Sequence, residues 1–153
     1  MMRFLFDTSV LVDYIRGDEM AANAIIAASQ KGKVYISCIS IMELWSSPMR
    51  KRRQIQAQIK KIKLLSEIYG LEEITCSERI QHRAQKLLEC VYAVLGKHAV
   101  PDALIMSAGI TRYACLVTTE RAWREAARQA MRCGVGRSTI QVMSPVEVVE
   151  KYA

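Results

Sequence analysis

Short apolar runs alternate with helix-like segments along most of this chain of 153 residues. The runs have the length of buried strands, whereas the segments between them repeat apolar side chains at the three- and four-residue spacing of a helix. The expected strands cover residues 4–6, 34–37, 73–76, 115–117 and 139–143. Strands that alternate with helices favour a mostly parallel sheet with helices on both faces. The sequence therefore predicts an α/β fold, a three-layer α/β/α sandwich around a sheet of roughly five strands.

Length and composition limit the class of protein. About half of the residues are apolar, which at this length supplies one substantial core, so we expect a single domain over residues 1–153. The chain contains no apolar run of about 18 residues, the minimum for a membrane-spanning helix, and no signal-peptide pattern. These features predict a cytoplasmic protein that does not span a membrane.

Several residue types that often carry chemistry receive no functional role from this sequence. The five cysteines include no Cys-x-x-Cys pair, and the chain has only two histidines, His82 and His98, so a zinc site has little support. We expect most of the cysteines to be reduced and to pack as small hydrophobic residues. We expect both histidines to be structural or solvent-facing, and Trp45 and Trp123 to fill space around the sheet.

Four acidic residues, Asp7, Glu43, Asp102 and Glu120, lie where an apolar run gives way to a turn or a helix. Burying a carboxylate without a partner is costly, so acids in such places suggest a shared cation. Mg²⁺ and Mn²⁺ prefer oxygen ligands, and a cluster of acids can hold one or two such ions. The pattern predicts a metal-dependent nuclease centre in which these four acids are catalytic and bind the metal. Neighbouring hydroxyl groups that could orient ligands or water belong to Thr8, Ser9, Thr118 and Thr119.

Each acid also has a simpler interpretation. Asp7 and Asp102 could cap the helices that follow them. Glu43 is expected in the first turn of a helix that Ser40 caps, and Glu120 at the start of another helix, where any acid benefits from the helix dipole. The metal-binding interpretation is favoured most for Asp7 and Asp102, because capping does not require an acid beside buried segments.

The basic residues are unevenly distributed along the chain. The net charge is +7, and no acidic residue lies between Glu43 and Glu67. Lysine and arginine side chains that neutralise phosphates gain affinity by releasing counterions, so this segment is a candidate RNA-binding surface. The alternative is an ordinary solvated helix face, because apolar residues in the same segment repeat at helical spacing. The candidate RNA-binding residues are Arg50, Arg52, Arg53, Lys60 and Lys63.

The acidic segments together resemble those of a known family, the PIN-domain ribonucleases, and in particular the VapC-type toxins of prokaryotic toxin–antitoxin pairs. The similar segments are FDTSVLVD at residues 6–13, ISIMEL at 39–44, VPDALI at 100–105 and LVTT at 116–119. They occur in the family's order and at roughly its spacing over nearly the whole chain. The resemblance implies a PIN-like fold.

The resemblance further implies a Mg²⁺- or Mn²⁺-dependent endoribonuclease, a hydrolase of RNA phosphodiester bonds, with Asp7, Glu43 and Asp102 as metal ligands. Two positions depart from the family pattern. Residues 45–48 lack the glycine that usually follows the helix glutamate, and the fourth acidic position carries Glu120 in place of aspartate or asparagine. The longer Glu120 side chain leaves open whether it reaches a metal directly or through water.

The resemblance also implies three partners, which are an RNA substrate, a cognate antitoxin protein and a second copy of the chain in a homodimer. One alternative function stays open because of Glu120. The chain could be a catalytically weak or degenerate PIN domain that binds RNA or a protein without cutting. No pattern in the sequence identifies the RNA, because substrates within one fold depend on loops and surface charge.

Overall fold

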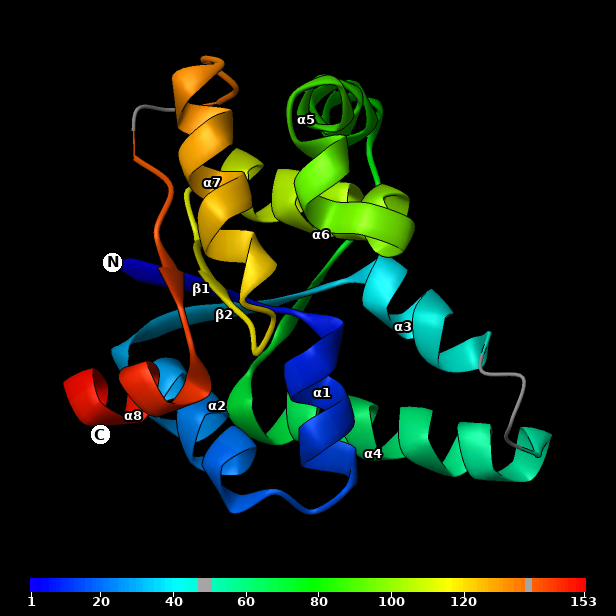
Figure 1. The fold of residues 1–153 in the computed structure, drawn as a ribbon. Coiled ribbons are helices and arrows are strands. Elements are labelled where there is room, and N and C mark those ends of the chain that lie inside the picture. The colour runs from blue at the N-terminus through cyan, green and yellow to red at the C-terminus, as the bar shows by residue number, and fades with distance from the viewer. Residues whose placement is uncertain (47–50, 137–138) are drawn as a thin grey trace.

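In the computed structural model, which describes residues 1–46, 51–136 and 139–153, helices lie on both faces of one parallel sheet (Figure 1). The strands are β1 (Met2–Phe6), β2 (Gly32–Ser37), β3 (Glu72–Ile74), β4 (Cys115–Val117) and β5 (Val142–Met143). Their order is β3-β2-β1-β4-β5, and every described pair of neighbours is parallel. The predicted three-layer fold is confirmed. The two edge strands, β3 and β5, are shorter than expected, because each pairs on one side only.

The helices begin and end near the residues that the sequence predicts. Asp18 caps its helix as expected, since its carboxylate accepts a hydrogen bond from Ala21 N at 2.9 Å. Gly70 ends another helix in the left-handed conformation, with φ of 67°, which glycine adopts without strain. The helices are α1 (Thr8–Ile15), α2 (Glu19–Lys31), α3 (Cys38–Trp45), α4 (Arg52–Tyr69), α5 (Glu78–Leu95), α6 (Ala99–Thr111), α7 (Ala122–Arg132) and α8 (Pro145–Tyr152), with a 3₁₀ turn at Gly96–His98.

Successive residues of each strand point to opposite faces of the sheet and therefore contact different helices. Phe4 and Phe6 pack with α1, α2, α4 and α8, whereas Leu5 and Leu116 pack with α5, α6 and α7. The helix α6 is buried on nearly all sides, as its apolar sequence predicts. It approaches the sheet closely at Gly109, where an added Cβ would lie 2.2 Å from Cδ2 of Leu116.

The direction in which the chain adds strands reverses at β1. The strands β2 and β3 lie on one side of β1, and β4 and β5 lie on the other. The ends of β1 and β4 are held together by a hydrogen bond of 2.9 Å from Asp7 N to Val117 O. Loops that leave two such strands diverge to opposite faces of the sheet, which leaves a crevice at their carboxyl ends.

The expectation of reduced, packed cysteines is wrong for two of the five. Cys90 of α5 and Cys133, directly after α7, form a disulfide with Cα atoms 6.6 Å apart. The two residues are 43 positions apart and meet because α5 packs against α7, which no local pattern indicates. Cys115 is buried in the core as expected. In the described ranges, no helix combines the length and apolar character that crossing a membrane requires.

Candidate active site

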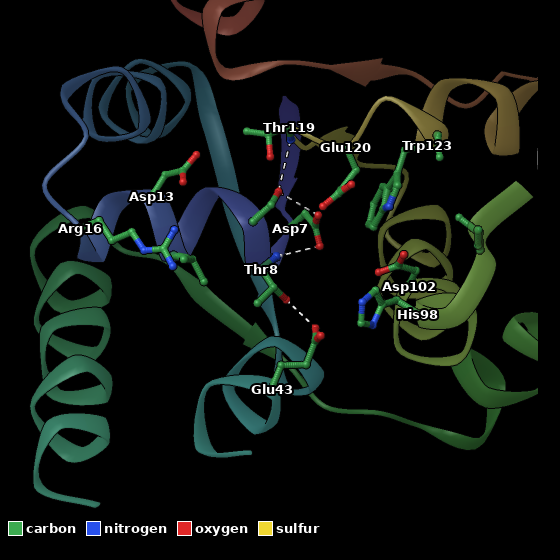
Figure 2. Close-up of a pocket in the computed structure, with 14 residues that line it drawn as sticks. Asp7, Thr8, Asp13, Arg16, Glu43, His98, Asp102, Thr119, Glu120 and Trp123 are labelled. Atoms are coloured by element: carbon green, nitrogen blue, oxygen red, sulfur yellow. Dashed lines mark hydrogen bonds between the residues drawn. The ribbon is translucent and has the colours of Figure 1, made fainter. Parts of the chain in front are cut away.

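A cavity of about 360 Å³ opens at the carboxyl ends of β1 and β4 (Figure 2). Asp7, Glu43, Asp102 and Glu120 all line this cavity, which we call the acidic pocket. Asp7 follows β1, Glu43 belongs to α3 and Asp102 to α6. Glu120 lies between β4 and α7. Four acids that are far apart in the sequence thus meet at one edge of the sheet.

Asp7 is the most buried of these acids, with only 3% of its surface exposed. Its Oδ1 accepts a hydrogen bond from Thr8 N at 2.7 Å, and this bond caps α1. Its Oδ2 accepts two more, from the hydroxyls of Thr118 at 2.8 Å and Ser9 at 3.0 Å. Burial raises the pKa of Asp7 to about 6, although these three hydrogen bonds oppose the increase.

Asp102 lies in the first turn of α6 but does not cap it, because the capping position belongs to His98. Burial is the largest cause that raises the pKa of Asp102, which reaches about 7. The charges of Asp7, Glu43 and Glu120 add to the increase, since like charges disfavour one another's ionisation. Burial and the neighbouring acids therefore both favour the protonated form of Asp102.

Glu43 is held in place by α1 through the hydroxyl of Thr8. Thr8 Oγ1 donates to Glu43 Oε1 at 2.7 Å and shares a hydrogen bond of 2.8 Å with Ser40 Oγ. The expectation that Ser40 caps α3 is wrong, because the extended backbone of Ser37 lets its hydroxyl accept a hydrogen bond from Ile39 N at 3.1 Å. Glu43 consequently falls in the second turn of α3, away from the capping groups.

Glu120 is exposed and precedes α7 rather than beginning it. Its backbone N–H donates to Thr118 Oγ1 at 3.0 Å, so the turn after β4 is tied to the hydroxyl that also holds Asp7. Thr8, Ser9 and Thr118 each hydrogen-bond a carboxylate of the acidic pocket. Thr119 lines the pocket, and its backbone N–H donates to Ser9 Oγ at 3.2 Å.

Four residues without a role in the sequence analysis also line the acidic pocket, namely Asp13, Arg16, His98 and Trp123. Asp13 and Arg16 follow Ser9 by four and seven residues along α1 and its C-terminal end, so helical spacing could have identified them. His98 is exposed at the start of α6, and Trp123 is fully buried in α7. No sequence pattern links these two residues to the acids, because they reach the pocket through the packing of α6 and α7 against the sheet.

The basic residues predicted to bind RNA lie outside the acidic pocket. Arg50 falls outside the described residues, and Arg52, Arg53, Lys60 and Lys63 are exposed on α4. Within the described ranges, Arg16 is the only arginine or lysine that lines the pocket. Next to Arg16, Lys61 of α4 donates to Ile15 O at 3.3 Å, so the basic helix contacts the end of α1 that carries Arg16.

The donor atoms of the acidic pocket suit a hard divalent cation. They are carboxylate and hydroxyl oxygens, which Mg²⁺ and Mn²⁺ prefer. Burial raises the pKa of Asp7 and of Asp102, and the charges of neighbouring acids add to both increases. A cation bound beside these carboxyl groups would favour their charged forms. In the part of the chain that the structure describes, no three acidic, histidine or cysteine side chains are arranged to hold a metal ion. The absence of such a group of three among the described residues is compatible with Mg²⁺, which keeps several waters and takes only one or two carboxylates directly.

Comparisons with known proteins agree with this architecture. A sequence profile of the PIN domain matches residues 4–129. Comparison with curated proteins finds no match.

Solved structures with a similar fold come from toxin–antitoxin complexes. VapBC2 from Rickettsia felis, bound to a DNA fragment from its promoter, has a TM-score of 0.69 at 20% identity, covering 94% of this chain and 98% of that chain. A toxin–antitoxin complex from Klebsiella pneumoniae has a TM-score of 0.60 at 21% identity, covering 93% and 97%. FitAcB from Neisseria gonorrhoeae has a TM-score of 0.64 at 16% identity, covering 95% and 99%. At these identities the likeness is one of fold.

Proposed function

The chain belongs to the PIN-domain family, and from this premise we propose that it is a metal-dependent endoribonuclease and the toxin of a toxin–antitoxin pair. The observation that carries the proposal is the convergence of four carboxylates on one cavity at the switch point of the sheet. Acids gathered in this way destabilise a folded protein unless a cation offsets their charge, so the cluster indicates function rather than stability. The strand β5 and helix α8, beyond the matched segment, share the sheet and the core, and we infer one domain over residues 1–153.

We assign Asp7, Glu43 and Asp102 as the residues that hold a Mg²⁺ or Mn²⁺ ion. Glu120 completes the site, directly or through water. A cation held by these acids would supply Lewis-acid chemistry, which would lower the pKa of a bound water and offset the charge on the leaving oxygen. Hydroxyl groups around the pocket restrict the rotation of two of these acids, because Thr118 and Ser9 donate to Asp7 and Thr8 donates to Glu43. These hydrogen bonds limit the orientations that the carboxyl groups of Asp7 and Glu43 can take.

Arg16 and the basic face of α4 provide the positive charge that an RNA substrate requires. Arg16 makes no hydrogen bond or ion pair through its side chain among the described residues, so its guanidinium is available for a phosphate next to the cleaved bond. The contact between Lys61 and Ile15 places α4 beside Arg16. An RNA strand that leaves the pocket past Arg16 would then meet α4, where Arg52, Arg53, Lys60 and Lys63 are exposed.

The antitoxin is proposed because one of the similar structures is described as a toxin–antitoxin complex. The homodimer is proposed from the resemblance to VapC-type toxins. A groove of about 270 Å³ beside α4 is lined in part by Ile41, Ile62 and Leu71, and Leu64 and Ile68 are exposed on the same helix. An apolar surface of this kind suits the amphipathic helix of an antitoxin. We place the protein in the cytoplasm, where such a toxin meets RNA. A small upstream reading frame with a DNA-binding N-terminus would support this assignment.

A second candidate function is a degenerate PIN domain that binds RNA or a protein without cutting. Two observations favour it. Glu120 is exposed at the fourth acidic position, and the described carboxylates are not arranged to enclose a metal ion. The two functions differ in one property, which is the binding of a divalent cation to the acidic pocket.

Calorimetric titration of the EDTA-treated protein with Mg²⁺ and with Mn²⁺ distinguishes the two functions. The nuclease proposal predicts that the wild type binds the ion and that Asp102→Asn does not. Asp18→Asn is the matched control, because Asp18 also lies at a helix start but is exposed and does not line the pocket. The control should bind the ion as the wild type does. A wild type that binds neither ion would instead support the degenerate domain.

A further inference from the structure

Trp123 carries a buried polar group at the edge of the acidic pocket that lacks a hydrogen-bond acceptor. Its ring is fully buried in the first turn of α7 and lines the pocket. Its Nε1 makes no hydrogen bond within the described part of the chain. A buried donor without an acceptor destabilises the folded protein, whereas a purely apolar side chain at this position would avoid this penalty. Packing alone therefore does not explain why this position carries an indole.

The surroundings of the indole identify its acceptor. Figure 2 shows the Trp123 ring beside the carboxyl groups of Asp102 and Glu120. Trp123 and Asp102 both line the acidic pocket, and each lies in the first turn of its helix. The indole N–H makes no hydrogen bond to this carboxyl group in the metal-free protein. Rotation of the Asp102 side chain to another rotamer would change which way its oxygens face.

Asp102 is a better acceptor for the indole than Glu120. Glu120 is exposed, so water can satisfy its carboxylate. Asp102 is partly buried, so fewer waters can reach its carboxyl group. A neutral donor such as an indole stabilises that charged form without cancelling its charge, whereas a lysine or arginine in the same place would compete with a cation for the carboxylate.

We propose that Trp123 is a positioning residue for Asp102. Its indole N–H donates to one carboxylate oxygen of Asp102 and leaves the other oxygen for the divalent cation. The inference rests on the proposed function, because it concerns the state in which the pocket holds its cation. Ligating carboxylates are commonly fixed by such outer hydrogen bonds, and loss of an outer partner typically lowers metal affinity about 10–100-fold. The disulfide between Cys90 and Cys133 fixes the far end of α7 to α5, which helps to hold the helix that carries Trp123.

The first test is the indole N–H resonance of Trp123 in ¹⁵N-labelled protein. The chain has two tryptophans, and Trp45→Phe assigns the two indole resonances. Addition of Mg²⁺ to the metal-free protein should move the Trp123 indole proton downfield and slow its exchange with water. The Trp45 resonance should stay in place, because Trp45 is 44% exposed and does not line the pocket. An unchanged Trp123 resonance at saturating Mg²⁺ would overturn the proposal.

The second test replaces Trp123 with phenylalanine, which keeps an aromatic ring, removes the donor and is smaller than the indole. Calorimetry should show a 10–100-fold weaker affinity for Mg²⁺ in Trp123→Phe. Urea unfolding in EDTA should show little change in stability, because removal of an unpaired buried donor offsets the cavity that the smaller ring leaves. Trp45→Phe should match the wild type in both measurements.

The outcomes separate this inference from the proposed function. If Trp123→Phe binds Mg²⁺ as tightly as the wild type but is less stable, Trp123 is a packing residue and only this inference fails. If the wild type binds no Mg²⁺, the proposed function and the inference fail together. If Trp123→Phe does not fold, the indole resonance of the wild type still distinguishes a positioning role of Trp123 from a packing role.

Discussion

Replacing Asp7 with asparagine should make the metal-free protein more stable at neutral pH, although it removes an acid that we propose as a metal ligand. Burial raises the pKa of Asp7 from 3.8 to about 6, and a tenfold change in proton affinity corresponds to about 1.4 kcal/mol. Ionised Asp7 therefore lowers the free energy of unfolding by about 3 kcal/mol at pH 7.5. The asparagine amide must reverse its hydrogen bonds with Thr118 and Ser9, at a cost of about 1 kcal/mol. We expect a net gain of about 2 kcal/mol.

The stability gained by Asp7→Asn should increase as the pH rises, because the pKa of Asp7 is raised in the folded protein. Because the pKa of Asp7 is higher in the folded than in the unfolded protein, the folded state binds more protons between about pH 4 and pH 6. Wild-type stability therefore falls as the pH rises through this range, and Asp7→Asn lacks this loss. The difference in unfolding free energy should grow up to about pH 6 and stay constant above it. Urea unfolding in EDTA at a series of pH values, followed by circular dichroism, measures this difference.

Asp18→Asn is the control for this measurement, because Asp18 also caps a helix but is exposed. Asparagine is an equally good helix cap, so the control should change the free energy of unfolding by no more than about 0.5 kcal/mol at any pH. The reasoning is refuted if Asp7→Asn is less stable than the wild type by the same amount at every pH. Asp7 would then act as a structural cap of α1.

Further variants test the substrate surface and the disulfide. Arg16→Gln should weaken RNA binding in a filter assay and leave Mg²⁺ affinity unchanged, because we propose that Arg16 contacts phosphate rather than the cation. Equal RNA affinity in the wild type and the variant would show that Arg16 does not bind the RNA. A variant with glutamine in place of Arg52, Arg53 and Lys60 of α4 should show a weaker salt dependence of RNA binding. The slope of log RNA affinity against log salt concentration should fall by up to about one per lost phosphate contact, for RNAs of many sequences. An unchanged slope would make α4 an ordinary solvated face. Replacing Cys90 and Cys133 with serine should lower the free energy of unfolding by about 4 kcal/mol, because the disulfide joins residues 43 apart; the wild type in reducing agent should match this variant.

The fold could be predicted from the sequence because its signals are local. The apolar stripe of α4, at Ile55, Ile59, Ile62 and Leu65, has helical spacing and is buried as that spacing requires. Helix boundaries were less certain where two residues could cap the same helix. Ser37 and Ser40 both precede Glu43, and the backbone at the end of β2 decides in favour of Ser37.

The acids of the pocket could be found because each lies where an apolar segment ends, and the carboxyl ends of parallel strands meet at one edge. The residues around them could not be found in this way. Trp123 reaches the pocket only through the packing of α7, and the Cys90–Cys133 disulfide only through the packing of α5 against α7. Contacts between distant segments leave no periodic pattern in the sequence, so they become visible only in the folded chain.

We infer that the acidic pocket is a metal-dependent site of RNA cleavage. The most direct measurement incubates RNA with the purified protein in EDTA, Mg²⁺ or Mn²⁺, and compares the wild type with Asp102→Asn purified in the same way. We expect the wild type to cleave RNA with either ion and to stop in EDTA, and we expect folded Asp102→Asn to cleave in neither condition. Cleavage by the wild type in EDTA, or equal cleavage by Asp102→Asn with metal, would contradict the claim.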